Sequence, residues 1–233
     1  MSFIHRTSTL SACCIAAAAL VIAGCAKSVY VHPDREDFQG RSERLPLSAE
    51  LMIEDGGNRF TLRDPGQKRP QRFHLDYAVQ VYGRKALEQV FREVTLYTPE
   101  GTTAPGQKRI EFRSDAGRRK ADRIVKLSLG PGSKVDLGDK LIGEKTMEVE
   151  LLCRVYDAGG EKLLWEGRGM GRSAKSYKTL YGPVDAASSL LLLQRPVHGT
   201  LLQMIATESI MASLEQINDG LLGAGKAAVL KAE

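Results

Sequence analysis

Residues 146–160 read TMEVELLCRVYDAGG, and this stretch decides the expected fold. From Met147 to Val155 every second side chain is apolar, and the side chains between them are mostly polar. A period of two is typical of a strand that packs one face against a core. The DAGG sequence at 157–160 favours a tight turn. We therefore predict a long β-hairpin whose second strand covers residues 161–172.

Three glycines, Gly167, Gly169 and Gly171, lie at alternate positions of that second strand. Glycine offers no side chain to pack and often marks a bulge when it lies inside a strand. We expect these glycines to weaken the far end of the hairpin or to allow a bulge there.

Further strands are predicted at 47–54 and 124–129 by the same alternation, with a short strand at 94–97. The turn sequence DGGN follows the first of these strands at 55–58. Phe60 and Leu62 then continue the alternation. This arrangement predicts that residues 47–54 form a strand pair with the residues after the turn.

Apolar residues recur every three or four positions in two segments, 75–93 and 201–222. That spacing predicts two helices, each with one buried stripe. In the first helix the stripe includes Val79, Tyr82 and Val90. The complete order of elements predicts an α+β fold, in which one mainly antiparallel sheet carries two helices packed on one face.

The composition is that of a globular chain, because 26% of the 233 residues are charged and 42% are hydrophobic. The first 24 residues nevertheless differ from the rest. Arg6 precedes an apolar stretch at 10–23, which has the length of a signal-peptide core and is short for a membrane span. The stretch ends in Ile22-Ala23-Gly24-Cys25.

This ending resembles the lipobox of bacterial lipoproteins. The resemblance implies that residues 1–24 are a signal peptide and that the thiol of Cys25 receives a diacylglycerol. Cleavage then exposes the amine of Cys25 for a further acyl chain. Ala26 follows where an aspartate would favour retention in the inner membrane. By resemblance to Gram-negative lipoproteins, we expect anchoring in the outer membrane, on its periplasmic face.

Three segments are expected after the signal peptide: a polar lipidated tether at 25–46, a periplasmic α+β domain at 47–222 and a flexible tail at 223–233. The order of elements, together with the lipobox, is similar to small periplasmic lipoproteins of the lipopolysaccharide-assembly and curli-secretion type. That resemblance implies an accessory, assembly or docking factor of the cell envelope, with an envelope protein as its partner.

Residues that could support catalysis are few. Cys153 lies in the apolar alternation of the hairpin, which predicts a buried core residue. The histidines after residue 25 are far apart, so their spacing does not suggest a metal site. Glu148 and Glu150 share one strand face, and we interpret them as a solvated surface and not as the acid pair of a hydrolase. We therefore expect no enzyme, no cofactor and no metal.

Basic residues concentrate in two loops, 59–72 and 108–123, within a chain whose formal net charge is +5. Together the loops could form a cationic patch for lipopolysaccharide or peptidoglycan, which is the alternative function, or they could simply keep the protein soluble. Nucleic acid is not expected, because no aromatic residues alternate with the basic ones. The candidate binding residues of the second loop are Arg109, Arg113, Arg118, Arg119, Lys120 and Arg123.

A run of four leucines at 190–193 lies in the connection before the second helix. Such a run is costly when it is exposed to water. It either packs over the sheet as a short helix or inserts into a partner or the membrane surface. Leu191 and Leu192 are therefore candidate partner-binding residues.

Overall fold

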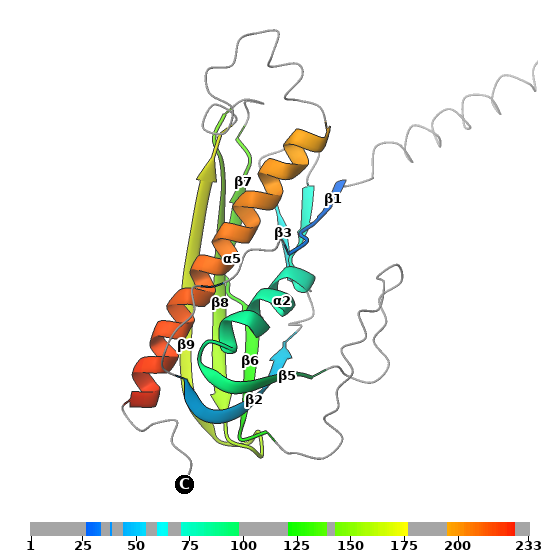
Figure 1. The fold of residues 1–233 in the computed structure, drawn as a ribbon. Coiled ribbons are helices and arrows are strands. Elements are labelled where there is room, and N and C mark those ends of the chain that lie inside the picture. The colour runs from blue at the N-terminus through cyan, green and yellow to red at the C-terminus, as the bar shows by residue number, and fades with distance from the viewer. Residues whose placement is uncertain are drawn as a thin grey trace, which may run out of the picture.

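A computed structural model describes residues 27–33, 38, 44–54, 60–64, 71–97, 121–138, 143–176 and 195–226. It confirms the α+β class (Figure 1). Residues 1–24, which the sequence predicts to be a signal peptide, lie outside these ranges, as do Cys25 and residues 227–233 of the predicted tail. None of the helices in the described ranges has the length and hydropathy needed to span a membrane.

The larger of two sheets is built around the predicted hairpin. Its central strand pairs antiparallel with three neighbours: β8 (Lys145–Tyr156) with β6 (Arg123–Leu129), β7 (Lys134–Asp136) and β9 (Leu163–Lys175). The turn is closed by the Asp157 backbone N–H, which donates to the Lys162 carbonyl at 3.0 Å. The alternate side chains from Met147 to Val155 are fully buried, so the predicted hairpin and its inward face are confirmed.

The predicted pairing of residues 47–54 with the residues after the turn is wrong. β2 (Leu45–Ile53) instead pairs in parallel with β5 (Phe91–Leu96) on one side and with β6 on the other. Phe60 and Leu62 are buried as expected, but Leu62 lies in β3 (Thr61–Arg63), which belongs to the smaller sheet. Parallel strands need a long crossover connection, and the residues between β2 and β5 supply it.

The smaller sheet has the strand order β1-β4-β3, in which β1 (Lys27–Tyr30) is parallel to β4 (Gln71–His74). Residues 27–30 therefore do not belong to a free tether, and residues 61–63 and 71–72 of the predicted loop 59–72 lie in strands. Both corrections have one cause, because Val31 and Phe73 reach the core and are at most 1% exposed.

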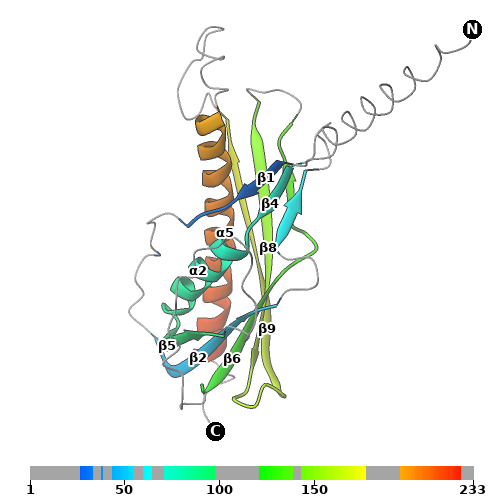
Figure 2. The same cartoon turned by 90° about the vertical axis from the view of Figure 1, so that its right-hand side faces the viewer.

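Both helices cover the same face of the larger sheet, as predicted (Figures 1 and 2). α2 (Asp76–Leu87) ends before Glu93, because Val90 and Phe91 enter the core at the start of β5. α5 (Arg195–Lys226) is longer than predicted at both ends. The predicted stripes are buried, with Tyr82 in α2 and Leu202 and Ile210 in α5 at most 1% exposed.

The three glycines of β9 neither break the strand nor create a bulge at its far end. The pairing of β8 with β9 continues to Lys145 and Lys175, and its one irregularity lies at Val155/Tyr156 near the turn. Instead, a Cβ atom added at Gly169 would lie 1.9 Å from the Ser213 carbonyl oxygen of α5. The Ser213 hydroxyl donates to the Gly169 carbonyl at 2.8 Å. Gly169 and Gly171 let helix and sheet approach at backbone distance, whereas a Cβ atom at Gly167 would meet the side chain of Trp165.

Asp122 joins the start of β6 to β2, and this contact makes a pH-dependent contribution to stability. Its Oδ2 accepts hydrogen bonds from the Ser48 backbone N–H at 2.7 Å and from the Ser48 hydroxyl at 2.8 Å. These bonds, the backbone one first, lower the pKa of Asp122. Because the folded pKa lies below the unfolded one, the contribution is present above the unfolded value of about 3.9 and is lost as the pH falls through the folded value.

We predict that Asp122→Asn lowers the free energy of unfolding by about 1 kcal/mol at neutral pH, and that this difference disappears in acid. Urea unfolding at pH 7 and at about pH 2.5 measures both values. Glu215→Gln, at an exposed position of α5, is the control and should change neither value. If Asp122→Asn were still less stable than the native protein in acid, the stabilisation could not come from ionised Asp122.

Candidate docking surface

Most residues that the sequence suggests for binding lie outside the described ranges. These are Cys25, Arg109, Arg113, Arg118, Arg119, Lys120, Leu191 and Leu192. Arg123 is described, as the first residue of β6, and it is 8% exposed. Its Nη1 donates to the Asp122 carbonyl at 2.6 Å. Since a partner cannot easily reach a buried guanidinium, Arg123 is not included in the surface described below.

Cys153 is completely buried, as its place in the alternation predicts. Burial raises the pKa of its thiol, because the thiolate would lose its hydration. A thiol in this state is a poor nucleophile at neutral pH. The described ranges contain no group of three metal-ligating side chains.

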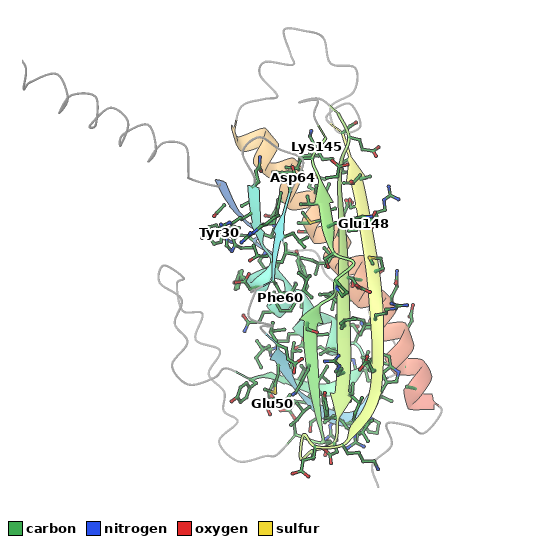
Figure 3. The ribbon with its side chains drawn as sticks, turned by 180° about the vertical axis from the view of Figure 1, so that it is seen from behind. Tyr30, Glu50, Phe60, Asp64, Lys145 and Glu148 are labelled. Atoms are coloured by element: carbon green, nitrogen blue, oxygen red, sulfur yellow. The ribbon has the colours of Figure 1, made fainter. Side chains whose placement is uncertain are left out.

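The face of the larger sheet that α2 and α5 leave uncovered carries a charged surface (Figure 3). We call its upper part the open face, which consists of Lys134, Glu148, Glu150, Arg168, Met170 and Arg172. These residues come from three adjacent strands, β7, β8 and β9. The register places Glu148 between Lys134 and Arg172, and it places Glu150 opposite Met170.

Glu148 lies between two cations. Its Oε2 is 3.1 Å from the Lys134 Nζ, and its Oε1 is 3.6 Å from the Arg172 Nε. The Glu148 side chain is only 21% exposed, whereas those of Lys134 and Arg172 are 70% and 65% exposed. The carboxylate therefore lies beneath the two cationic groups.

Glu150 is buried, and the expectation that it is a solvated surface residue is wrong. It is 6% exposed because the turn at 130–133 folds over it. Its Oε2 accepts a hydrogen bond from the Gly132 backbone N–H at 2.7 Å, and its carbonyl accepts one from the Gly130 N–H at 2.8 Å. A Cβ atom at Gly130 would lie 2.4 Å from Glu150 Oε2, so any other residue at position 130 would have to displace the Glu150 side chain.

Arg168 completes the open face above Glu150. Its Nη1 is 3.7 Å from Glu150 Oε1, and its side chain is 77% exposed. At this distance and exposure the guanidinium keeps N–H donors for other acceptors. Arg168, Met170 and Arg172 alternate along β9, so their side chains leave the same face at steps of about 7 Å. Met170 is 38% exposed between the two arginines.

The lower part of the same sheet face is more evenly balanced. There Arg154 lies 2.9 Å from Glu166 and 3.8 Å from Glu54, and Lys126 lies 3.2 Å from Glu54. These acidic and basic side chains have similar exposures, from 26% to 50%. The accessible positive charge of this face therefore concentrates on the open face, around Met170.

No family model matches this chain, and no curated protein matches its sequence. Similar solved structures include a DUF330 protein from Xanthomonas campestris, with 7% identity, a TM-score of 0.47, and coverage of 87% of this chain and 99% of that chain. An uncharacterised lipoprotein B from Nitrosomonas europaea has 13% identity, a TM-score of 0.39, and coverage of 84% and 96%. A minor lipoprotein from Acinetobacter baumannii has 9% identity, a TM-score of 0.38, and coverage of 78% and 96%. These values assign no function to this chain.

Proposed function

We propose that this protein is a lipid-anchored, non-enzymatic docking or assembly factor of the bacterial cell envelope. The sequence Ile22-Ala23-Gly24-Cys25, after an apolar stretch, supports the anchor. Ala26 supports placement in the outer membrane, with the domain in the periplasm. One residue, Ala26, separates Cys25 from the start of β1, so the anchor would hold the folded domain close to the lipid.

The exposed row Arg168-Met170-Arg172 is the observation that carries the docking role. Arginine and methionine are enriched at protein–protein interfaces. The arginines hold their own carboxylate partners only loosely, at 3.6 and 3.7 Å, so a partner's carboxylates can take over these contacts at little cost. The partner that fits best is an envelope protein with an acidic surface and an apolar pocket for Met170.

The test is photo-crosslinking in intact envelopes from position 170, with Glu215 on α5 as the control position. We expect one protein to be crosslinked from position 170 and not from position 215. Met170→Asp should reduce co-purification of that protein with a C-terminally tagged chain at least about tenfold, as truncation of a central interface residue does. Glu215→Lys should leave it unchanged, and Cys25→Ala, which removes the anchor, should abolish it.

The alternative function is a lipopolysaccharide- or peptidoglycan-binding module that uses the loops 59–72 and 108–123. Arg63 and Arg72, which belong to the first of these loops in the sequence, are exposed and support it. Recovery of lipopolysaccharide or glycan without a protein would contradict the docking role. Neutralising Arg118, Arg119 and Lys120 should then abolish binding in a salt-dependent way. Protein docking through the leucine run should instead be lost when Leu191 or Leu192 is charged, with little effect of salt.

A further inference from the structure

The smaller sheet has an outer face formed by alternate residues of its three strands. The register places Ser28, Arg72 and Arg63 in one row across its strands, and Tyr30, His74 and Thr61 in the next. We call these six residues the outer face. Val29, Phe73 and Leu62 point the other way, and Phe73 is completely buried. One side of this sheet therefore packs on the core, and the other faces solvent.

Among the described residues, no ion pair compensates the positive charge of the outer face. Arg63 and Arg72 lie directly opposite each other on antiparallel strands, and both are exposed. Within the described residues neither guanidinium has an ion pair, and none of the residues of β1, β3 and β4 is acidic. Like charges in directly opposite positions destabilise a strand pair. An anion bound across both arginines would remove that repulsion.

Beside the arginines lies an exposed aromatic side chain. Tyr30 is 58% exposed and stacks on the His74 ring, with 4.6 Å between ring centroids and an interplanar angle of 12°. Figure 3 shows Tyr30 projecting at the side of the molecule, away from the sheet that carries Glu148. Tyrosine is enriched where membranes meet water, since its ring is apolar and its hydroxyl is polar.

The position of the outer face relative to the anchor indicates what this face contacts. β1 begins at Lys27, and Cys25 lies two residues earlier, so at most about 7 Å of chain separates them. β1 is held in the sheet along its whole length by β4. If Cys25 is acylated, as proposed above, the outer face starts at the level of the lipid headgroups and cannot move far from them.

We propose that the outer face docks on the anionic lipid headgroups of the membrane that holds Cys25. Arg63 and Arg72 bind headgroup phosphates, and Tyr30 lies at the interface. This inference rests on the proposed lipid anchor. It adds that the domain holds a fixed orientation relative to the membrane. The open face, which belongs to the other sheet, then stays available to a protein partner.

The experiment uses the full lipidated protein, processed in cells, purified and reconstituted on vesicles. A fluorophore is attached at Thr61→Cys, on β3, the strand of this sheet farthest from the anchor. The native Cys153 is buried and does not compete for the label. A lipid-borne quencher reports contact with the membrane, and Glu215→Cys on α5 is the matched control. The vesicles contain either phosphatidylcholine alone or about 30% phosphatidylglycerol.

We expect strong quenching at position 61 on the anionic vesicles and weak quenching at position 215. The double variant Arg63→Glu/Arg72→Glu should lower the ratio of docked to undocked protein about tenfold or more, and about 0.5 M salt should do the same. Arg63→Lys/Arg72→Lys, which keeps the charge, should still dock. An unchanged urea midpoint shows that the charge-reversed variant is folded.

Flotation of the vesicles separates the two proposals. A chain that does not float with either vesicle would overturn both the anchor and the docking. If the chain floats but position 61 is quenched no more than position 215, or equally on both vesicles, the docking is overturned and the anchor stands. If the fluorescence at position 61 changes only when envelope proteins are added, lipid docking is also overturned, because the outer face would then be a protein interface.

Discussion

Replacing Gly171 by alanine is expected to lower the free energy of unfolding by about 3 kcal/mol. A Cβ atom at this position would lie 1.8 Å from the Ser209 carbonyl oxygen and 2.7 Å from the Ser213 backbone nitrogen. Both atoms belong to the backbone of α5, which cannot turn aside as a side chain could. The added methyl group therefore forces the helix away from β9 along the close contact.

The helix has little freedom to accept that displacement. The Ser209 hydroxyl lies between two carbonyl acceptors, at 2.8 Å from Met147 of β8 and at 2.7 Å from Ile205 of α5, and the Ser213 hydroxyl donates to Gly169 in β9. Both serines are completely buried. Moving α5 outward would stretch the contacts with Met147 and Gly169 and would take the buried Ser213 hydroxyl from its acceptor, which adds to the steric cost. Gly169→Ala should behave in the same way.

The measurement is urea unfolding followed by circular dichroism, with thermal unfolding as a second probe. For a chain of this size the melting temperature of Gly171→Ala should fall by about 6–12 °C. Gly223→Ala is the matched control, because this α5 glycine is exposed and nothing lies within 4 Å of an added Cβ. It should stabilise the helix by up to about 1 kcal/mol. Equal effects of the two substitutions would contradict the close packing of α5 on β9.

The hairpin could be predicted from the sequence, but the structural role of its glycines could not. The alternation from Met147 to Val155 and the turn at 157–160 are local signals, and the hairpin follows from them. The reason for glycine at 169 and 171 is not local, because the atoms that require it belong to Ser209 and Ser213, in a helix that follows much later in the chain. The strand pattern alone therefore predicts a weakened strand or a bulge at positions where the structure has close backbone contacts between β9 and α5.

The local sequence pattern also does not determine which strands pair with one another. The alternation in β2 predicts a strand with one buried face, but it does not choose between an antiparallel neighbour and the parallel neighbours β5 and β6. β1 and β4 have four residues each, too few for a periodic signal, and they form by pairing with each other. The apolar residues Val90 and Phe91 continue the helical spacing although Val90 lies in a turn and Phe91 begins β5, so the predicted helix is longer than α2.

The cross-strand neighbours on the open face could not be read from the turn sequence. A turn confined to 157–160 would pair residue 156 with residue 161 and place Glu148 opposite Gly169. The connection is longer and the register shifts at Val155/Tyr156, so Glu148 lies opposite Arg172 and Glu150 lies opposite Met170. The burial of Glu150 could not be read from the sequence either, because it depends on the path of the turn at 130–133. Two carboxylates on one strand face therefore have different surroundings. This difference leads to a second large effect.

Glu150→Lys is expected to lower the free energy of unfolding by about 3 kcal/mol or more, whereas Glu148→Lys should lower it by about 1 kcal/mol or less. At position 150 the new ammonium would be buried under the turn, facing the Gly132 N–H and the cation Arg168. At position 148 the new ammonium could move into solvent. Urea midpoints of the two variants give the comparison. Similar losses would mean that Glu150 is as accessible as Glu148.

A double-mutant cycle tests the cause of that difference. Gly130→Ala alone should be destabilising, because its Cβ would lie 2.4 Å from Oε2 and 2.5 Å from Cγ of Glu150. In a Glu150→Ala background those two atoms are gone, so Gly130→Ala should cost at least about 1 kcal/mol less than it does in the native protein. Additive effects would mean that the turn does not close over Glu150. A positive coupling would show that one buried carboxylate holds the turn beside Met170 and thereby shapes the edge of the open face.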